Sequence, residues 1–267
     1  MPVIAMTREM GSLGKDVAAG LADQMGLTVV HHELVEHNLA ERLGVQESAV
    51  HRYLEGGASL FERWKIDKEK LSRYTAEEIL ELAKKGNVVI RGWGAVAVLR
   101  AVPHVLRVRV CAPMPSRERV MVERLGLKSP SEAMREILQN DAAHARIMRG
   151  FFGVNWEDPQ LYHVVLNTGA VPVDACVSIV RLLAERPEFK VTDETRSVLA
   201  DKLMESRVRA ALGDAFATPI TVKVAMGKVT LTGTTMSPVS NVEELVRSVP
   251  GVTEVENRIV VVRSGAA

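Results

Sequence analysis

Residues 3–26 read VIAMTREMGSLGKDVAAGLADQMG. The first four letters are an apolar run typical of a buried strand, and a turn that contains Gly11 and Gly14 follows. Apolar residues then recur at four-residue spacing up to Gly26, which predicts a helix that ends at this glycine. The stretch therefore predicts a strand, a glycine-bearing turn and a helix in immediate succession, the first unit of an α/β fold.

The same alternation of strands and helices continues along the chain. Apolar runs predict further strands at residues 27–30, 88–90, 105–110 and 162–166. Helical patterns are predicted across most of 33–73 with a break at Gly56-Gly57, from a capping box at 75–78 to Gly86, from near Ser116, from near Ser129, and over 173–180. Strands that alternate with helices predict a parallel sheet with helices on both faces.

The pattern changes after Arg186-Pro187. One helix is predicted over residues 194–212, followed by two strands at 220–225 and 228–234 that form a hairpin around Met226-Gly227. A short helix after Ser237-Pro238 and a last strand at 255–262 complete the order α-β-β-α-β. We expect a separate small α+β unit, with the boundary between residues 187 and 193.

The composition is that of an ordinary globular protein. Of 267 residues, 47% are hydrophobic and 25% charged, and a net charge of +1 offers no global field for nucleic acid or an anionic membrane. The two cysteines, Cys111 and Cys176, lie in apolar stretches and are interpreted as buried thiols. Neither a signal-peptide pattern nor a run of ~20 apolar residues is present, so a cytoplasmic location is expected.

The turn after the first strand has part of a phosphate-binding motif. In the full pattern, G-x-x-x-x-G-K-[ST], backbone N–H groups surround phosphate, lysine reaches its oxygens and a hydroxyl binds Mg²⁺. Here Gly14-Lys15 is present, whereas Glu9 stands at the first glycine and Asp16 at the hydroxyl. Taken alone, the match also suits an ordinary strand-to-helix turn with a solvated lysine. Its position at the first strand of an α/β domain favours phosphate binding.

Residues 3–185 resemble the cytidylate-kinase-like proteins, relatives of the P-loop nucleoside monophosphate kinases. The resemblance is carried by TREMGSLGK at 7–15, HHEL at 31–34, VIRGWG at 89–94, VCAP at 110–113 and the segment from Asp141 to Thr168. It implies a kinase domain over residues 1–188 that binds ATP and Mg²⁺ and transfers a phosphoryl group to a nucleoside monophosphate such as CMP.

The resemblance also implies roles for individual residues. The donor nucleotide would be bound by Arg8, Gly11, Ser12, Leu13, Gly14, Lys15 and Asp16. The acceptor would be bound by His31, Arg91, Arg117 and Asp141. Catalysis would rest on Lys15 and on two lid arginines, Arg146 and Arg149. Arginines and a lysine suit phosphoryl transfer because the protein must position the reactants and neutralise the moving charge.

Three departures from the family pattern remove acidic or basic ligands. His31 and Cys111 stand where acids are common, and Ala142-Ala143 follows Asp141 where basic residues are common. Two alternatives to an active kinase therefore stay open: a nucleotide-binding sensor without turnover, and an interaction protein whose first domain is a scaffold. A metal site in residues 31–37 is not favoured, since Glu36 replaces the second histidine of the zinc-protease spacing H-E-x-x-H.

Residues 193–263 resemble a BON module. The matching stretches are VAMGKVTLTG at 224–233 and VPGVTEVENR at 249–258, where Gly227 and Gly251 permit tight turns. The resemblance implies a binding role toward a phospholipid surface or another protein, and no catalytic residue.

Overall fold

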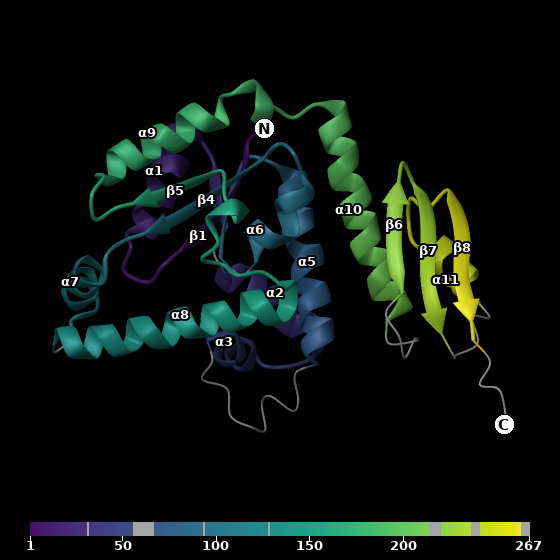
Figure 1. The fold of residues 1–267 in the computed structure, drawn as a ribbon, viewed down its shortest axis with the longest axis horizontal. Coiled ribbons are helices and arrows are strands. Elements are labelled where there is room, and N and C mark those ends of the chain that lie inside the picture. Colours follow the sequence, from purple (N-terminus) through teal and green to yellow (C-terminus); the bar gives the residue numbers. More distant parts are fainter. Residues whose placement is uncertain are drawn as a thin grey trace. The chain divides into compact units, whose positions relative to one another are not determined.

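The computed structural model describes residues 1–30, 32–55, 67–92, 94–127, 129–213, 220–235 and 241–262 (Figure 1). The chain divides into two compact units, Met1–Thr192 and Asp193–Ala267. Among the described residues, no helix combines the length and hydrophobicity that a membrane crossing requires.

The first unit contains a five-stranded parallel sheet in the order β2-β3-β1-β4-β5. Its strands are β1 (Val3–Arg8), β2 (Thr28–Val30), β3 (Val88–Arg91), β4 (Val105–Cys111) and β5 (Val164–Asn167). The predicted parallel sheet is confirmed. Because β1 is the central strand, the turn that follows it lies at the middle of the sheet's carboxyl edge, where ligands of open α/β sheets bind.

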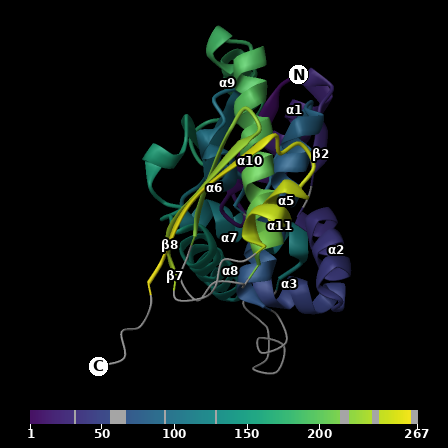
Figure 2. The same cartoon turned by 90° about the vertical axis from the view of Figure 1, so that its right-hand side faces the viewer.

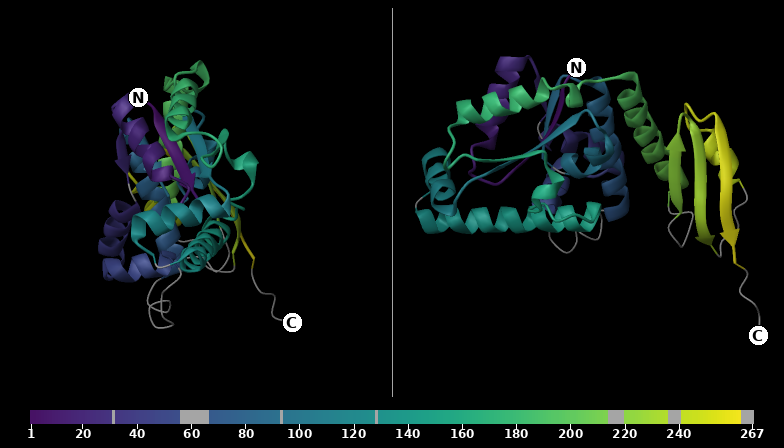
Figure 3. Two further views of the ribbon diagram at one scale, coloured as in Figure 1. Left: turned by 90° about the vertical axis from the view of Figure 1, so that its left-hand side faces the viewer. Right: turned by 45° about the horizontal axis from the view of Figure 1, so that its top comes forward.

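Helices cover both faces of this sheet. The α-helices described in this unit are α1 (Gly14–Met25), α2 (His32–Leu43), α3 (Glu47–Glu55), α5 (Lys68–Lys85), α6 (Ala95–Val98), α7 (Met114–Leu125), α8 (Pro130–Phe152) and α9 (Val173–Ala184). α1 and α9 lie side by side (Figure 3) and share a core with Ile4 and Met6 of β1. Val3 and Ala5 are equally buried and point to the opposite face, where α5 and α6 contact the sheet.

Local capping signals explain where several helices begin. Ser129 caps α8 as predicted, because its Oγ accepts a hydrogen bond of 3.2 Å from the Glu132 N–H and Pro130 occupies the first turn. The capping-box prediction at 75–78 was wrong: α5 begins at Lys68, with Asp67 as its cap. Thr75 lies inside that helix and donates its hydroxyl to the Leu71 carbonyl at 2.7 Å. The predicted break at Gly56-Gly57 lies outside the described residues.

The second unit has the predicted α-β-β-α-β order. It consists of α10 (Asp193–Leu212), β6 (Thr221–Ala225), β7 (Lys228–Thr235), α11 (Val242–Arg247) and β8 (Glu254–Val261). β6 and β7 form an antiparallel hairpin, and β8 pairs parallel to β7. Both helices share one hydrophobic core with the sheet (Figure 2). The predicted helix start at Ser237-Pro238 lies outside the described residues.

Candidate functional site

The turn between β1 and α1 is held from three sides, by the ends of β4 and β5 and, through Arg117, by α7. Ser12 donates its hydroxyl to the carbonyls of Glu9 at 2.8 Å and of Val110 at 3.1 Å. Thr168, beyond β5, donates its hydroxyl to the Ser12 carbonyl at 2.7 Å. The turn is thereby bonded to the ends of β4 and β5, so its backbone conformation is part of the folded core.

Two glycines let other groups approach this turn closely. Gly11 has φ +79°, and a Cβ there would lie 2.8 Å from the Arg117 carbonyl oxygen. A Cβ at Gly14, the first residue of α1, would lie 2.6 Å from the Cβ of Arg8. Glycine is therefore required at Gly11 by both backbone geometry and space, and at Gly14 by space.

Glu9, at the position of the motif's first glycine, is an anchor under the turn. Its carboxylate accepts a hydrogen bond of 2.8 Å from Arg109 Nη2 and one of 3.2 Å from the Ala112 N–H. Arg117 Nη1 lies 3.5 Å from the same carboxylate. Arg109 also donates to the Trp156 carbonyl and stacks over the Trp156 ring at 4.5 Å. Glu9, which stands in place of the motif's first glycine, thus connects the turn to β4, α7 and the segment after α8.

Arg117 and Asp141, both expected to bind the acceptor, form an ion pair in which the arginine is buried and the carboxylate is partly exposed. Arg117 Nη2 donates to Asp141 at 2.6 Å and Arg117 Nε donates to the Met10 carbonyl at 2.7 Å. Burial raises the pKa of Asp141, and the hydrogen bond from Arg117 opposes that rise. In this structure the pair supports the turn and joins α7 to α8.

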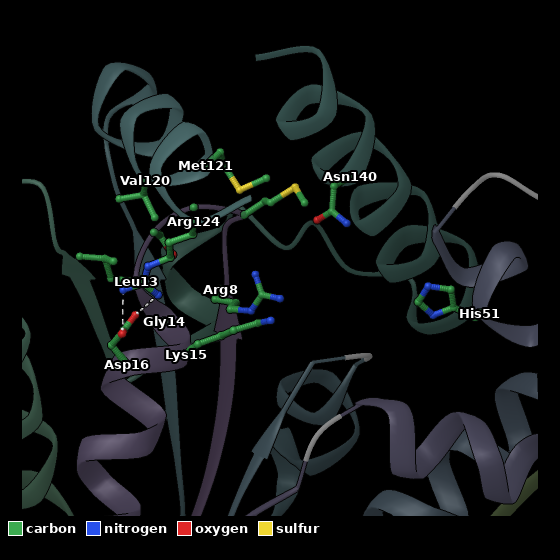
Figure 4. A pocket seen from close by; sticks show the side chains of 13 residues that line it. Arg8, Leu13, Gly14, Lys15, Asp16, His51, Val120, Met121, Arg124 and Asn140 are labelled. Atoms are coloured by element: carbon green, nitrogen blue, oxygen red, sulfur yellow. Dashed lines mark hydrogen bonds and ion pairs between the residues drawn. The ribbon is translucent and has the colours of Figure 1, made fainter. Parts of the chain in front are cut away.

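A pocket of about 310 Å³ opens above the turn. Its walls come from β1, the turn, and helices α1, α3, α7 and α8; they are Arg8, Met10, Gly11, Ser12, Leu13, Gly14, Lys15, Asp16, His51, Val120, Met121, Arg124 and Asn140. Figure 4 shows the side chains of Arg8 and Lys15 extending side by side into this space. All seven residues expected to bind the donor therefore line one pocket.

The electrostatics of the pocket favour an anion. Asp16, the one acidic residue in the described lining, is bonded by both oxygens to Arg124, each at 2.8 Å. That pair is close to neutral, and Arg8 and Lys15 add two cationic side chains to the described lining. The first turn of α1 adds backbone N–H groups and the positive end of the helix dipole. A phosphate group carries negative charge and several acceptor oxygens, so it can bind to cationic side chains and backbone N–H groups arranged in this way.

The wall opposite the turn carries two polar side chains, His51 from α3 and Asn140 from α8 (Figure 4). His51 Nδ1 lies 2.9 Å from Glu36 Oε2, and the Glu36 side chain is only 2% exposed. The sequence reasoning missed both wall residues, and Arg109 as well. For Arg109 a signal existed, because a charged residue between Val108 and Val110 interrupts an apolar strand.

The remaining expected site residues lie elsewhere. Arg91 is buried at the end of β3, paired in register with Met6. Arg146 and Arg149 are exposed on α8, and Arg146 lines a second pocket of about 210 Å³ with Tyr53, Lys68 and Phe151. His31 lies outside the described residues. No cluster of three or more potential metal ligands occurs in the described part of the chain.

Comparison with known proteins gives relatives for each unit. Residues 200–263 match the model of the BON domain. An uncharacterized protein from Eubacterium ventriosum superimposes with a TM-score of 0.55 at 18% identity, covering 70% of this chain and 100% of its own, which shows the fold.

Curated relatives of the first unit are named cytidylate kinase. The protein from Pyrobaculum aerophilum is 28% identical over 179 residues, covering 67% of this chain and 90% of its own length. The protein from Thermococcus kodakarensis is 25% identical over 179 residues, covering 67% and 86%. The model of the cytidylate kinase-like family matches residues 3–170, more than half of the chain. The chain therefore belongs to the cytidylate kinase-like family.

Proposed function

We propose that the protein transfers the γ-phosphoryl group of ATP to a nucleoside monophosphate of the CMP type. The observation that carries this proposal is the convergence of Arg8, Lys15 and the start of α1 on one pocket at the centre of the sheet's carboxyl edge. The relatives named cytidylate kinase support this acceptor class.

The pocket's cations suit the chemistry of this reaction. An oxygen of the acceptor phosphate forms a bond to the γ-phosphorus while the bond to the β–γ bridging oxygen breaks, and ADP leaves. Negative charge shifts between phosphate groups throughout, so the protein has to orient them and neutralise that charge. Lys15 and Arg8 line the same pocket as the first turn of α1, which supports a role for both side chains in contacting the donor phosphates.

Kinases of this kind use Mg²⁺ to neutralise and bridge the phosphates. Mg²⁺ prefers oxygen ligands and takes most of them from phosphates and water, with one or two carboxylates from the protein. Asp16 supplies a carboxylate in the pocket lining and fits that need. Its pairing with Arg124 means that this contact must rearrange for Asp16 to act as a ligand.

We assign Arg146 and Arg149 as lid cations in this proposal, on the same helix as Asn140. They lie outside the lining of the main pocket, so the assignment requires α8 to shift when both substrates are bound.

The test is a phosphoryl-transfer assay with ATP, Mg²⁺ and a panel headed by CMP, dCMP and UMP. We expect Lys15→Ala to lower kcat/KM by about a hundredfold or more, because a charge that stabilises the transition state is lost. Lys84→Ala, an exposed change at the end of α5, is the matched control and should leave the rate unchanged. A wild-type protein that phosphorylates no member of the panel contradicts the proposal.

A second candidate is a nucleotide sensor without turnover that signals through the BON domain to a protein or phospholipid partner. The pairing of Asp16 with Arg124 favours it, because the carboxylate that stands in place of the motif's Mg²⁺-binding hydroxyl is engaged by a guanidinium. Calorimetry and the acceptor panel together distinguish the two candidates: the kinase and the sensor both bind ATP, and the sensor forms no product. A scaffold would show no rise in thermal stability with any nucleotide.

A further inference from the structure

A histidine and a buried glutamate form one wall of the main pocket. His51, on α3, lies across the pocket from Arg8 and Lys15 (Figure 4). Its side chain is 41% exposed, whereas that of Glu36, on α2 behind it, is 2% exposed. The imidazole therefore borders the pocket, and the carboxylate is enclosed by the protein.

The contact between these two residues fixes the ring. Nδ1 of His51 lies 2.9 Å from Oε2 of Glu36. Burying a carboxylate costs several kcal/mol, and the contact with His51 offsets part of that cost while it orients the ring. When the ring is protonated, the two residues form an ion pair whose positive member borders the pocket and whose negative member is buried behind it.

Among the described residues that line the pocket, His51 is the one on the far wall that can carry positive charge. Of the thirteen described residues that line the pocket, five are ionisable: Arg8, Lys15, Asp16, His51 and Arg124. Arg8, Lys15 and Asp16 belong to β1, the turn and the start of α1, and Arg124 is bonded to Asp16. An anion bound on the α3 side of the pocket would therefore meet the imidazole of His51, which is a cation when it is protonated.

We propose that His51, oriented by Glu36, binds an anionic oxygen of the acceptor's phosphate group. This inference rests on the proposed function, in which the turn and Lys15 hold the donor's phosphates and the acceptor's phosphate faces them. An acceptor phosphate is largely ionised near neutral pH, so it needs a positive partner and no base to remove a proton. Glu36 is a positioning residue, because it acts through the imidazole.

Steady-state kinetics with four variants test this role. We expect His51→Gln to raise the KM for CMP about tenfold while the KM for ATP and kcat change less than about twofold. Glu36→Gln should raise the KM for CMP in the same direction, and His51→Arg should recover part of the loss because it restores a cation. His37→Gln is the matched control, since this exposed histidine on α2 lies outside the pocket lining and should change neither KM.

Other kinetic results overturn the proposal. A fall in kcat with an unchanged KM for CMP would make His51 a base for a hydroxyl acceptor. A raised KM for ATP would place it at the donor, and no change in any constant would leave it a structural residue. Failure of Glu36→Gln to fold does not affect the comparison of His51→Gln with His51→Arg.

A binding experiment separates this proposal from the proposed function. If the wild-type protein shows no turnover, the affinity for CMP is measured by calorimetry in the presence of a non-hydrolysable ATP analogue. Affinity reduced about tenfold in His51→Gln supports the role of His51 although the kinase activity has failed. Equal affinity in the two proteins, or no CMP binding by the wild type, overturns it.

Discussion

At the residue scale, Gly11 combines two requirements that usually occur separately. Its φ of +79° is one that residues with a side chain rarely adopt, and a Cβ would lie 2.8 Å from the Arg117 carbonyl oxygen. Because Arg117 also bonds the Met10 carbonyl, a shift of its backbone would disturb the turn itself.

We predict that Gly11→Ala destabilises the first unit and abolishes nucleotide binding. The matched control is Gly26→Ala, at φ +64° with open space around it, which should cost only the ~1–2 kcal/mol of left-handed backbone strain. Gly11→Ala should cost more, because contact with Arg117 is added to that strain. Urea unfolding followed by tryptophan fluorescence measures both, and equal losses would contradict the prediction.

A second residue-scale prediction concerns His144, whose ring packs on Trp156 at 4.4 Å. Burial, with the nearby Arg8 and Arg109 cations, lowers the pKa of His144 from 6.5 to about 3. The unfolded chain therefore binds a proton below pH 6.5 that the folded protein does not bind until about pH 3. The contribution of His144 to the free energy of unfolding is complete above pH 6.5. As the pH falls below 6.5, this contribution decreases by at most about 1.4 kcal/mol per pH unit.

His144→Gln should flatten this decline between pH 6.5 and 5. Unfolding midpoints measured across that range provide the test, and an unchanged slope would be the contrary result. His37→Gln is an informative comparison because Glu47 and Glu41 raise the pKa of His37. Its contribution has the opposite sign: it is present at low pH and is lost as the pH rises through the raised pKa.

At the scale of elements, the Glu9 carboxylate joins parts of the chain that lie about a hundred residues apart. It holds Arg109 of β4 and Arg117 of α7, both buried. We predict that Glu9→Gln lowers the free energy of unfolding by about 3 kcal/mol, because two buried cations lose their shared anion.

Asp16→Asn is the control for Glu9→Gln. It removes an ion pair with Arg124 that is far more exposed, and should cost less than about 1 kcal/mol. Denaturant titrations compare the two variants directly. Similar losses would show that Arg109 finds sufficient partners in Trp156 and Tyr162.

The helices also show how much of the structure could be predicted from the sequence alone. The start of α8 was predictable because Ser129, Pro130 and Glu132 form a local signal. The start of α5 was not, because Thr75 and Glu78 satisfy the capping-box spacing inside a helix that Asp67 had already begun. The loop residues that line the pocket followed from their motif. His51 and Glu36 could not be found this way, because only the packing of α3 on α2 brings them together.

At the scale of the whole molecule, the two units differ in their spectroscopic signals. All three tryptophans of the chain lie before residue 192, so tryptophan fluorescence reports on the first unit alone. Far-UV circular dichroism reports on both. We predict that ATP raises the unfolding midpoint of the fluorescence transition.

The expected size of this shift follows from binding to the native state. At a ligand concentration of 100 Kd the first unit gains about 2.7 kcal/mol. Lys15→Ala should remove the shift. A fluorescence midpoint that ATP leaves unchanged would contradict the prediction.

The three-sided anchoring of the β1–α1 turn has a consequence for ligand exchange. Hydrogen bonds from Ser12 and Thr168 and the contacts of Arg117 hold the backbone of the turn through the protein's own groups. Arrival of a nucleotide then requires little ordering of the main chain, which lowers the entropic barrier to association. Differences in residence time between nucleotides would accordingly arise from side chains and helices around the pocket rather than from reorganisation of the turn.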